Sequence, residues 1–103
     1  MRFKTYKLSK LERNRYSILT DDMAHCYLCG VPIVEVHEIC GGNNRRISME
    51  NGFCVPLCRH HHMQVTVNNT MNRELKQICQ KKFEETHTRE DWMQLIRKNY
   101  LEE

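Results

Sequence analysis

The spacing of apolar residues changes along the chain, and the change separates the strands that it predicts from the helices. Ile33–Ile39 is β-branched at four positions and roughly alternates apolar with polar residues, so it predicts a strand. Phe53–Leu57 predicts a second short strand, in which Pro56 favours a sheet edge or the end of the strand. Tyr16–Thr20 has strand-like content and stops at two aspartates. Gly41–Asn44 interrupts the pattern after the first strand and predicts a loop.

Helical spacing dominates after the second strand. A helix is expected to begin near Cys58 and to carry His61 and His62. Two longer helices follow, over about Asn72–Glu85 and about Arg89–Asn99. Their apolar faces consist of Leu75, Ile78, Cys79 and Phe83 in the first, and of Trp92, Leu95, Ile96 and Tyr100 in the second.

Two local signals complete the predicted elements. Thr88, with Asp91 three residues later, resembles a capping box in which aspartate replaces the usual glutamate. A short helix is expected around Leu8–Arg13. The predicted fold class is α+β, a small domain with additional helices at its C-terminal end.

The organisation of the chain predicts one domain over residues 1–103. Residues 1–15 form a basic N-terminal arm, residues 16–64 hold the cysteine knuckle and the core of the predicted site, and residues 70–101 hold the C-terminal helices. The sequence shows no repeat, no low-complexity tract and no linker rich in proline or glycine.

Composition and length favour a metal-stapled protein. A chain of 103 residues buries a limited fraction of its surface, so a bound metal is a natural supplement to the core. The N-terminus leads into no apolar run, which predicts no secretory signal, and no stretch is long enough to span a bilayer. We therefore expect a cytoplasmic protein without membrane contact, in which cysteines bind metal in preference to forming disulfides.

The net charge of +3 is compatible with a nucleic-acid partner, and its distribution is more informative. Residues 1–16 carry six basic side chains against Glu12 alone. This arm can follow a phosphate backbone or simply increase solubility.

Two cysteine and histidine pairs have the spacing of a structural zinc site. Cys26 and Cys29 form one pair, and Cys58 and His61 form the other from the start of a helix. Gly30 relaxes the backbone after the first pair. Cys54 and His60 are rival candidates for the fourth ligand. Cys40 and Cys79 are surplus, and Cys79 lies on the apolar face of its helix.

A second set of candidate ligands consists of Glu35, His37, Glu38 and His62. In a strand, Glu35 and His37 share one face and Glu38 lies on the other. If the helix that carries His62 packs across the strands, His37 and His62 can hold one divalent ion with open coordination positions. Taken singly, each of these residues is more simply a polar surface residue, and the zinc anchor is what brings His62 near the strands.

The order of these motifs resembles the HNH endonuclease family. The resemblance rests on the Cys-x2-Cys pair, then Val36-His37-Glu38-Ile39, then Val55-Pro56-Leu57-Cys58 followed by His61-His62. It is closest to a short phage-encoded branch with a Gly-x-x-Asn-Arg loop, here Gly41–Arg45. The likeness covers roughly residues 8–101 and implies a ββα-metal finger stapled by an adjacent zinc.

The resemblance also implies roles for individual residues. Cys26, Cys29, Cys58 and His61 would bind the structural zinc, and His37 and His62 would bind a catalytic Mg²⁺ or another divalent transition metal. The general base of the family is usually a histidine where this chain has Glu38, so either Glu38 or His37 takes the proton. The middle Asn of the family motif falls near Phe53 here; Asn51 is two residues away and Asn44 is in the loop.

The predicted function is that of a metal-dependent DNA endonuclease that hydrolyses phosphodiester bonds, as a monomer or homodimer. Arg45, Arg46 and Asn44 are the candidate DNA-binding residues, because a planar guanidinium suits bidentate contact with phosphate. One alternative is a zinc-stapled DNA-binding module that has lost catalysis. The other is an adaptor in a phage packaging or recombination assembly, which would use the predicted Trp92–Tyr100 helix.

Overall fold

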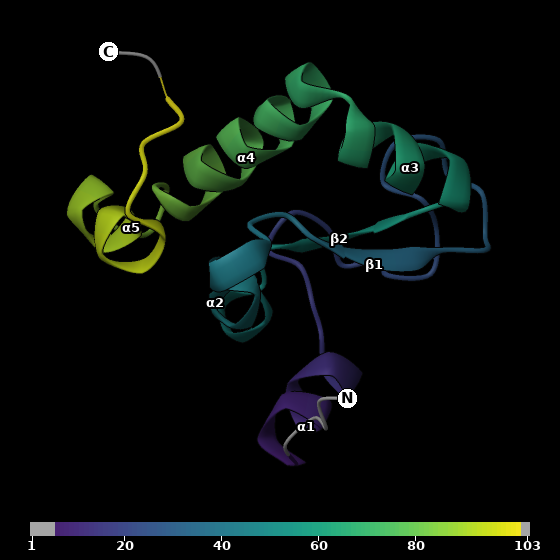
Figure 1. Cartoon of the computed structure of the whole chain (residues 1–103), viewed down its shortest axis with the longest axis horizontal. Coiled ribbons are helices and arrows are strands. Elements are labelled where there is room, and N and C mark those ends of the chain that lie inside the picture. Colours follow the sequence, from purple (N-terminus) through teal and green to yellow (C-terminus); the bar gives the residue numbers. More distant parts are fainter. Residues whose placement is uncertain (1–5, 102–103) are drawn as a thin grey trace.

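The two predicted strands pair antiparallel and form the centre of the domain (Figure 1). In the computed structural model, which describes residues 6–101, β1 spans Glu35–Glu38 and β2 spans Cys54–Leu57. The register places His37 opposite Val55 and Glu38 opposite Cys54. Both strands are edges in a two-stranded sheet, so Pro56 is accommodated without the loss of a central ladder bond.

Helices surround this pair of strands. They are α1 (Tyr6–Arg13), the single 3₁₀ turn η1 (Gly42–Asn44), α2 (Arg45–Asn51), α3 (Arg59–Val67), α4 (Asn69–Phe83) and α5 (Arg89–Ile96). In Figure 1, α3 lies on one side of the strands, whereas α1 lies on the other. The α+β class is therefore confirmed. None of the helices within residues 6–101 is long and apolar enough to cross a membrane.

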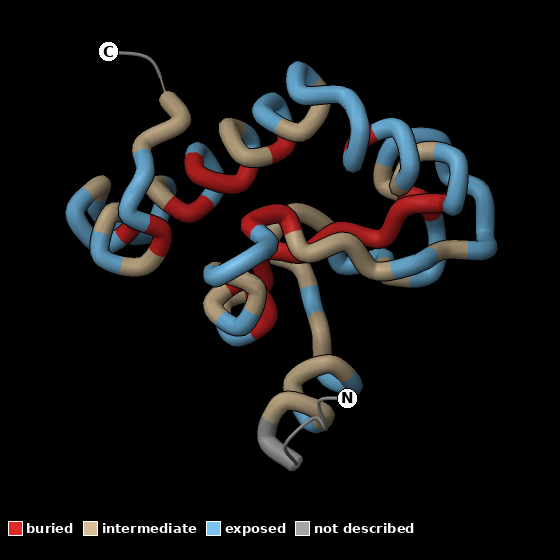
Figure 2. The backbone as a smooth tube through the Cα atoms, viewed as in Figure 1, coloured by how far each residue is buried: buried red, intermediate tan, exposed pale blue. Residues whose placement is uncertain are grey.

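The core lies between β2 and the C-terminal helices. Phe53, Val55 and Leu57 are fully buried, and Figure 2 shows the buried stretch of β2 facing the buried side of α4. The rings of Phe53, Phe83 and Trp92 pack with centroids 5.2–5.8 Å apart. Aromatic rings in tilted and edge-to-face arrangements such as these contribute beyond the area that they bury.

The helix ends differ from the predicted ones for local reasons. Asn68 caps α4 by accepting a hydrogen bond from the Met71 backbone, so this helix begins three residues before the predicted start. The chain turns at Arg97, where φ is 67°, so α5 ends at Ile96 and Tyr100 lies beyond the helix. The predicted capping box of Thr88 and Asp91 is confirmed in both directions.

The prediction of a strand over Tyr16–Thr20 is wrong. Side chains in this segment bond to its own backbone: Ser17 accepts from the Leu19 N–H, and Thr20 accepts from the Asp22 N–H. Such local bonds compete with a strand ladder. The Ile18 N–H donates to the Gly52 carbonyl and the Tyr16 hydroxyl donates to the Glu50 carbonyl, and these bonds tie the segment to the end of α2.

The sequence did not reveal α2, which begins where the predicted Gly41–Asn44 loop ends. Gly41–Asn44 form a tight turn that leads directly into this helix, so Arg45 and Arg46 lie in its first turn and not in a loop. Ser48 holds α2 to the end of β1 by donating to the Cys40 carbonyl at 2.6 Å. The first five residues of the predicted basic arm lie outside the described residues, and the arm continues as α1, where a short helix was predicted.

Gly52 gives a test of how α2 ends. Its φ is +76°, and a Cβ there would lie 2.5 Å from the Tyr16 ring. Gly42 also has a positive φ, of +60°, but open space around it. We expect Gly42→Ala to lower the free energy of unfolding by about 1–2 kcal/mol, the cost of a left-handed non-glycine residue. Gly52→Ala should cost clearly more in urea unfolding, because Tyr16 must also move. Equal losses in the two variants would contradict the packing of Tyr16 on Gly52.

Candidate metal centre

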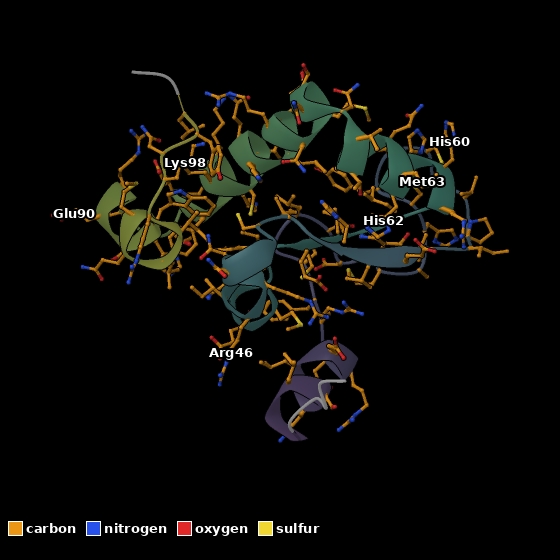
Figure 3. The ribbon with its side chains drawn as sticks, in the orientation of Figure 1. Arg46, His60, His62, Met63, Glu90 and Lys98 are labelled. Atoms are coloured by element: carbon orange, nitrogen blue, oxygen red, sulfur yellow. The ribbon has the colours of Figure 1, made fainter. Side chains whose placement is uncertain are left out.

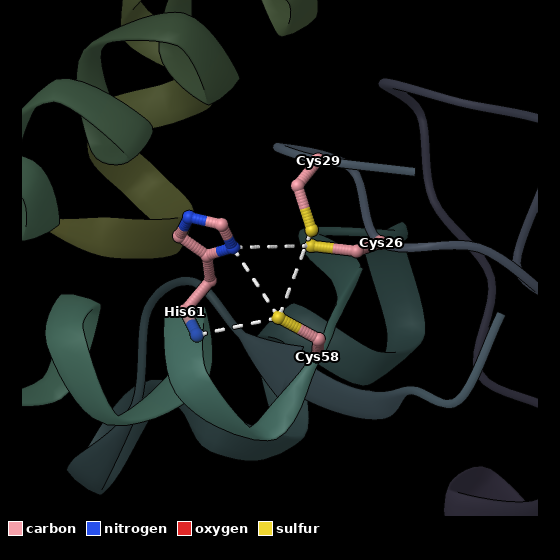
Figure 4. A group of neighbouring side chains, drawn as sticks. All are labelled: Cys26, Cys29, Cys58 and His61. Atoms are coloured by element: carbon pink, nitrogen blue, oxygen red, sulfur yellow. Dashed lines mark hydrogen bonds between the residues drawn. The ribbon is translucent and has the colours of Figure 1, made fainter. Parts of the chain in front are cut away.

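Four side chains predicted as zinc ligands converge at one point of the structure. Cys26 and Cys29 come from the knuckle before β1, and Cys58 and His61 come from the start of α3 (Figure 4). Their ligand atoms all lie within 4.8 Å of one another. Among the residues that the structure describes, this is the one set of three or more Cys, His, Asp or Glu side chains gathered so tightly. The group could hold a metal ion.

The distances in this Cys₃His cluster suit a tetrahedral zinc. With Zn–S bonds of about 2.3 Å, two thiolates on a tetrahedron lie about 3.8 Å apart. The sulfurs of Cys29 and Cys58 are 3.8 Å apart. The Nδ1 atom of His61 lies 3.7 Å from the Cys26 sulfur and 3.3 Å from the Cys58 sulfur. The donor set, three sulfurs and one imidazole, is one of the usual sets for structural zinc.

Backbone hydrogen bonds preform the knuckle. Gly30 donates to the Cys26 carbonyl, and Cys26 donates to the Val31 carbonyl, both at 2.8 Å. The Tyr27 N–H donates to the Pro56 carbonyl of β2, which joins the knuckle to the sheet. Burial raises the pKa of the Cys26 thiol, but backbone hydrogen bonds, led by that from Cys58, outweigh it and bring the pKa down to about 6. A thiol with that pKa is already largely the thiolate that a metal requires at neutral pH.

Cys58 has two roles at the start of α3. It is the N-cap of the helix, where its side chain accepts from the His61 backbone N–H. Its sulfur also belongs to the cluster. The helix start and the second ligand pair are therefore one structural unit.

The other cysteines and His60 lie outside the cluster. Cys54 is fully buried in β2, and its thiol points to the Ser48 carbonyl at 3.8 Å. His60 is exposed on α3 beside the His61 ring. Cys40 and Cys79 are buried in the core. Burial raises the pKa of Cys40 to about 11 and that of Cys54 to about 12, and it also raises the pKa of Cys79.

His37 and His62 lie side by side, 25 positions apart in the sequence. Their ring centroids are 5.2 Å apart in an edge-to-face arrangement. Figure 3 shows His62 extending from α3 toward the strands. Its Nδ1 lies 2.7 Å from a carboxylate oxygen of Glu35. A carboxylate on one ring nitrogen is how metal-binding histidines are commonly held, and it leaves Nε2 for the ion.

His37 has a buried nitrogen that suits a ligand. Its Nε2 is buried without a hydrogen-bond partner among the described residues, which is rare for a buried polar atom. Burial, followed by the charge of His62, lowers the pKa of His37 to about 4. The ring is therefore neutral at pH 7, and a neutral imidazole is the form that binds a metal ion.

Glu38 lies apart from this histidine pair. As the strand alternation predicted, its side chain emerges from the other face of β1. There one carboxylate oxygen accepts from Arg15, and the other accepts from the Nε of Arg45 at 3.2 Å. The structure therefore does not bring Glu38 together with His37 and His62.

The three predicted DNA-binding residues stay predictions, and the structure gives each of them partners. The guanidinium of Arg45 bonds Glu12 and Glu38, and the hydrogen bond to Glu12 raises its pKa. Arg46 is exposed and pairs with Glu50 at 3.3 Å. The Asn44 side chain donates to the Ile96 carbonyl at 3.4 Å. At the place of the family's middle Asn, Phe53 is a fully buried core residue, and Asn51 bonds back to Ile47.

Sequence reasoning missed the partners of Glu38. Arg15 precedes it by 23 positions, and no periodicity relates the two residues. Glu12, which bonds Arg45, the second partner of Glu38, lies still earlier in the chain. The one available signal was Glu12, the single acidic residue in a basic arm.

Comparisons of the chain with family models, with curated proteins and with solved structures gave no match.

The Cys₃His cluster makes a direct prediction about metal content and stability. We expect the purified protein to hold one zinc per chain, and chelation to abolish its cooperative thermal transition. Zinc binding at such sites is worth about 10 kcal/mol or more, comparable to the whole stability of a small domain. Elemental analysis and calorimetry measure the two quantities.

Matched cysteine variants locate the site. Cys29→Ser should lose the zinc, whereas Cys54→Ala should keep it although its core is weakened. A metal-free protein that retains its thermal transition would contradict the structural role of the cluster.

Proposed function

We propose that the protein is a metal-dependent DNA endonuclease of the HNH type, in which β1, β2 and α3 form the ββα unit. The order of elements supports this: two antiparallel strands are followed directly by a helix that carries His61 and His62. In this proposal, the Cys₃His cluster binds a structural zinc and sets the angle between α3 and the strands.

The observation that carries the proposal is the contact between His37 and His62. One imidazole comes from a strand and the other from a helix, and their rings lie 5.2 Å apart. Glu35 holds Nδ1 of one ring, and Nε2 of the other has no partner among the described residues. Two ring nitrogens with one carboxylate partner suit a single divalent ion that keeps open positions for substrate.

These residues define a division of labour at the proposed site. His37 and His62 would bind Mg²⁺ or another divalent transition metal, which when bound supplies charge stabilisation to the phosphate and lowers the pKa of water. Glu35 orients His62 through Nδ1. His37, with a pKa of about 4, serves better as a ligand than as a proton acceptor, because an effective general base has a pKa near the working pH.

The proposed site has no well-placed proton acceptor among the residues that the structure describes. Glu38 takes the family's base position, but both of its oxygens accept hydrogen bonds from arginines on the other face of β1. We therefore assign Glu38 no proton transfer. General-base catalysis typically contributes about 10²–10⁴-fold, so we expect slow turnover by an enzyme of this design.

The hydrogen bonds from arginines to both oxygens of Glu38 also support a second candidate function. A zinc-stapled DNA-binding module that has lost catalysis would keep the fold and the His37–His62 pair while using Glu38 for structure. Salt-sensitive DNA binding without cleavage under any divalent ion would favour this module over the enzyme.

Plasmid nicking with magnesium, manganese or nickel tests the enzyme. His37→Ala and His62→Ala should each reduce ion-dependent nicking on the order of a hundredfold or more, because a bound ion supplies several kcal/mol to the transition state. His60→Ala is the matched control: it removes an exposed histidine from the same helix, outside both clusters, and should nick as the wild type does. Nicking that survives in His37→Ala would exclude the proposed site.

A further inference from the structure

Four charged side chains fasten α1 to the rest of the domain. Arg15 bonds Glu38, Glu38 bonds Arg45, and Arg45 bonds Glu12 of α1. Arg15 also donates to the Glu12 carbonyl at 3.2 Å. This ion-pair quartet joins residues from α1, β1, α2 and the segment after α1.

The quartet is shielded and electrically balanced. The side chains of Glu12 and Glu38 are each 15% exposed, and those of Arg15 and Arg45 are 23% and 36% exposed. Two carboxylates offset two guanidiniums, so the quartet presents no net charge outward. Breaking one of its ion pairs would leave a partly buried charge without its partner, so the intact quartet is energetically favoured.

The charges that remain on α1 point outward. Lys10 and Arg13 are exposed, and neither forms an ion pair within the described part of the chain. Arg46 of α2 lies on the side of the strands where α1 lies (Figure 3). The acidic residue of α1, Glu12, thus serves to attach the helix, whereas Lys10 and Arg13 stay available on its exposed side.

We propose that Glu38 is a positioning residue, which holds α1 through the quartet so that Lys10 and Arg13 contact phosphates of bound DNA. The inference rests on the proposed DNA-binding function and names a surface for it. Because α1 lies across the strands from His62, these phosphates belong to flanking duplex and not to the cleaved bond. A polyanionic backbone is the partner that suits a rigid helix with adjacent, unpaired cations.

The direction in which one substitution changes the DNA affinity distinguishes a positioning role of Glu38 from a purely electrostatic effect. Glu38→Gln removes a negative charge, so charge alone predicts tighter DNA binding. If Glu38 positions α1, binding instead weakens, on the order of tenfold at 0.1 M salt for each phosphate contact that is lost. Glu90→Gln, an equal change of charge on the distant helix α5, is the matched control and should not weaken binding.

A second variant does not disturb the quartet. Lys10→Ala/Arg13→Ala should reduce the slope of log K against log salt by about 2, or about 0.9 for each phosphate contact. Adding Glu38→Gln to this variant should cost little more, because both changes remove the same contacts. Fluorescence anisotropy of a labelled duplex without divalent ions gives each constant, and zinc content with thermal unfolding checks that each variant is folded.

The outcomes distinguish this inference from the proposed function. If the wild type binds and nicks DNA but Lys10→Ala/Arg13→Ala keeps the full salt slope, the positioning role is wrong and the nuclease stands. If folded Glu38→Gln binds as tightly as the wild type or more tightly, the role is also wrong. No binding by the wild type at low salt would overturn both proposals.

Discussion

The convergence of Cys26, Cys29, Cys58 and His61 is the constraint on which the rest of the arrangement depends. It joins the knuckle before the sheet to the first turn of α3, two segments that the β1–β2 ladder does not itself connect. Because His61 and His62 are neighbours on a helix, their side chains point about 100° apart. Fixing the first toward the sulfurs therefore directs the second toward β1, where it meets His37 and Glu35.

Because side chains alternate along a strand, the two faces of β1 have different surroundings. His37 faces α3 and a neighbouring imidazole, whereas Glu38 faces two arginines. One peptide unit thus separates the histidine pair from a network of paired charges. For the cation proposed at His37, this separation would keep the carboxylate of Glu38 from competing for it and the arginines from repelling it.

Features set by periodicity and spacing could be predicted from the sequence, and those set by contacts distant in sequence could not. β1, β2, α3 and the Thr88 cap follow from local pattern, and the members of the Cys₃His cluster follow from doubled two-residue spacers. The seven residues of α2 are of mixed polarity and show no helical periodicity, so the sequence did not predict this helix. Tyr16–Thr20 has the composition of a strand, but local side-chain hydrogen bonds prevent it from forming one. The partners of Glu38 became visible only in three dimensions, because α1 reaches β1 after a turn that no pattern specifies.

The uneven distribution of the six thiols has a consequence for chemical damage. Cys40, Cys54 and Cys79 are sealed in the core as protonated thiols, which peroxides and alkylating reagents attack slowly. Cys29 is the exposed thiol of the six, and Cys26 in the same cluster favours the thiolate although it is buried. A reagent therefore reaches a thiol first at the knuckle, even though the pKa of Cys29 itself is raised, because a backbone hydrogen bond that lowers it is outweighed by desolvation and the neighbouring thiols. Oxidation there would first weaken the attachment of α3 rather than disrupt the apolar interior.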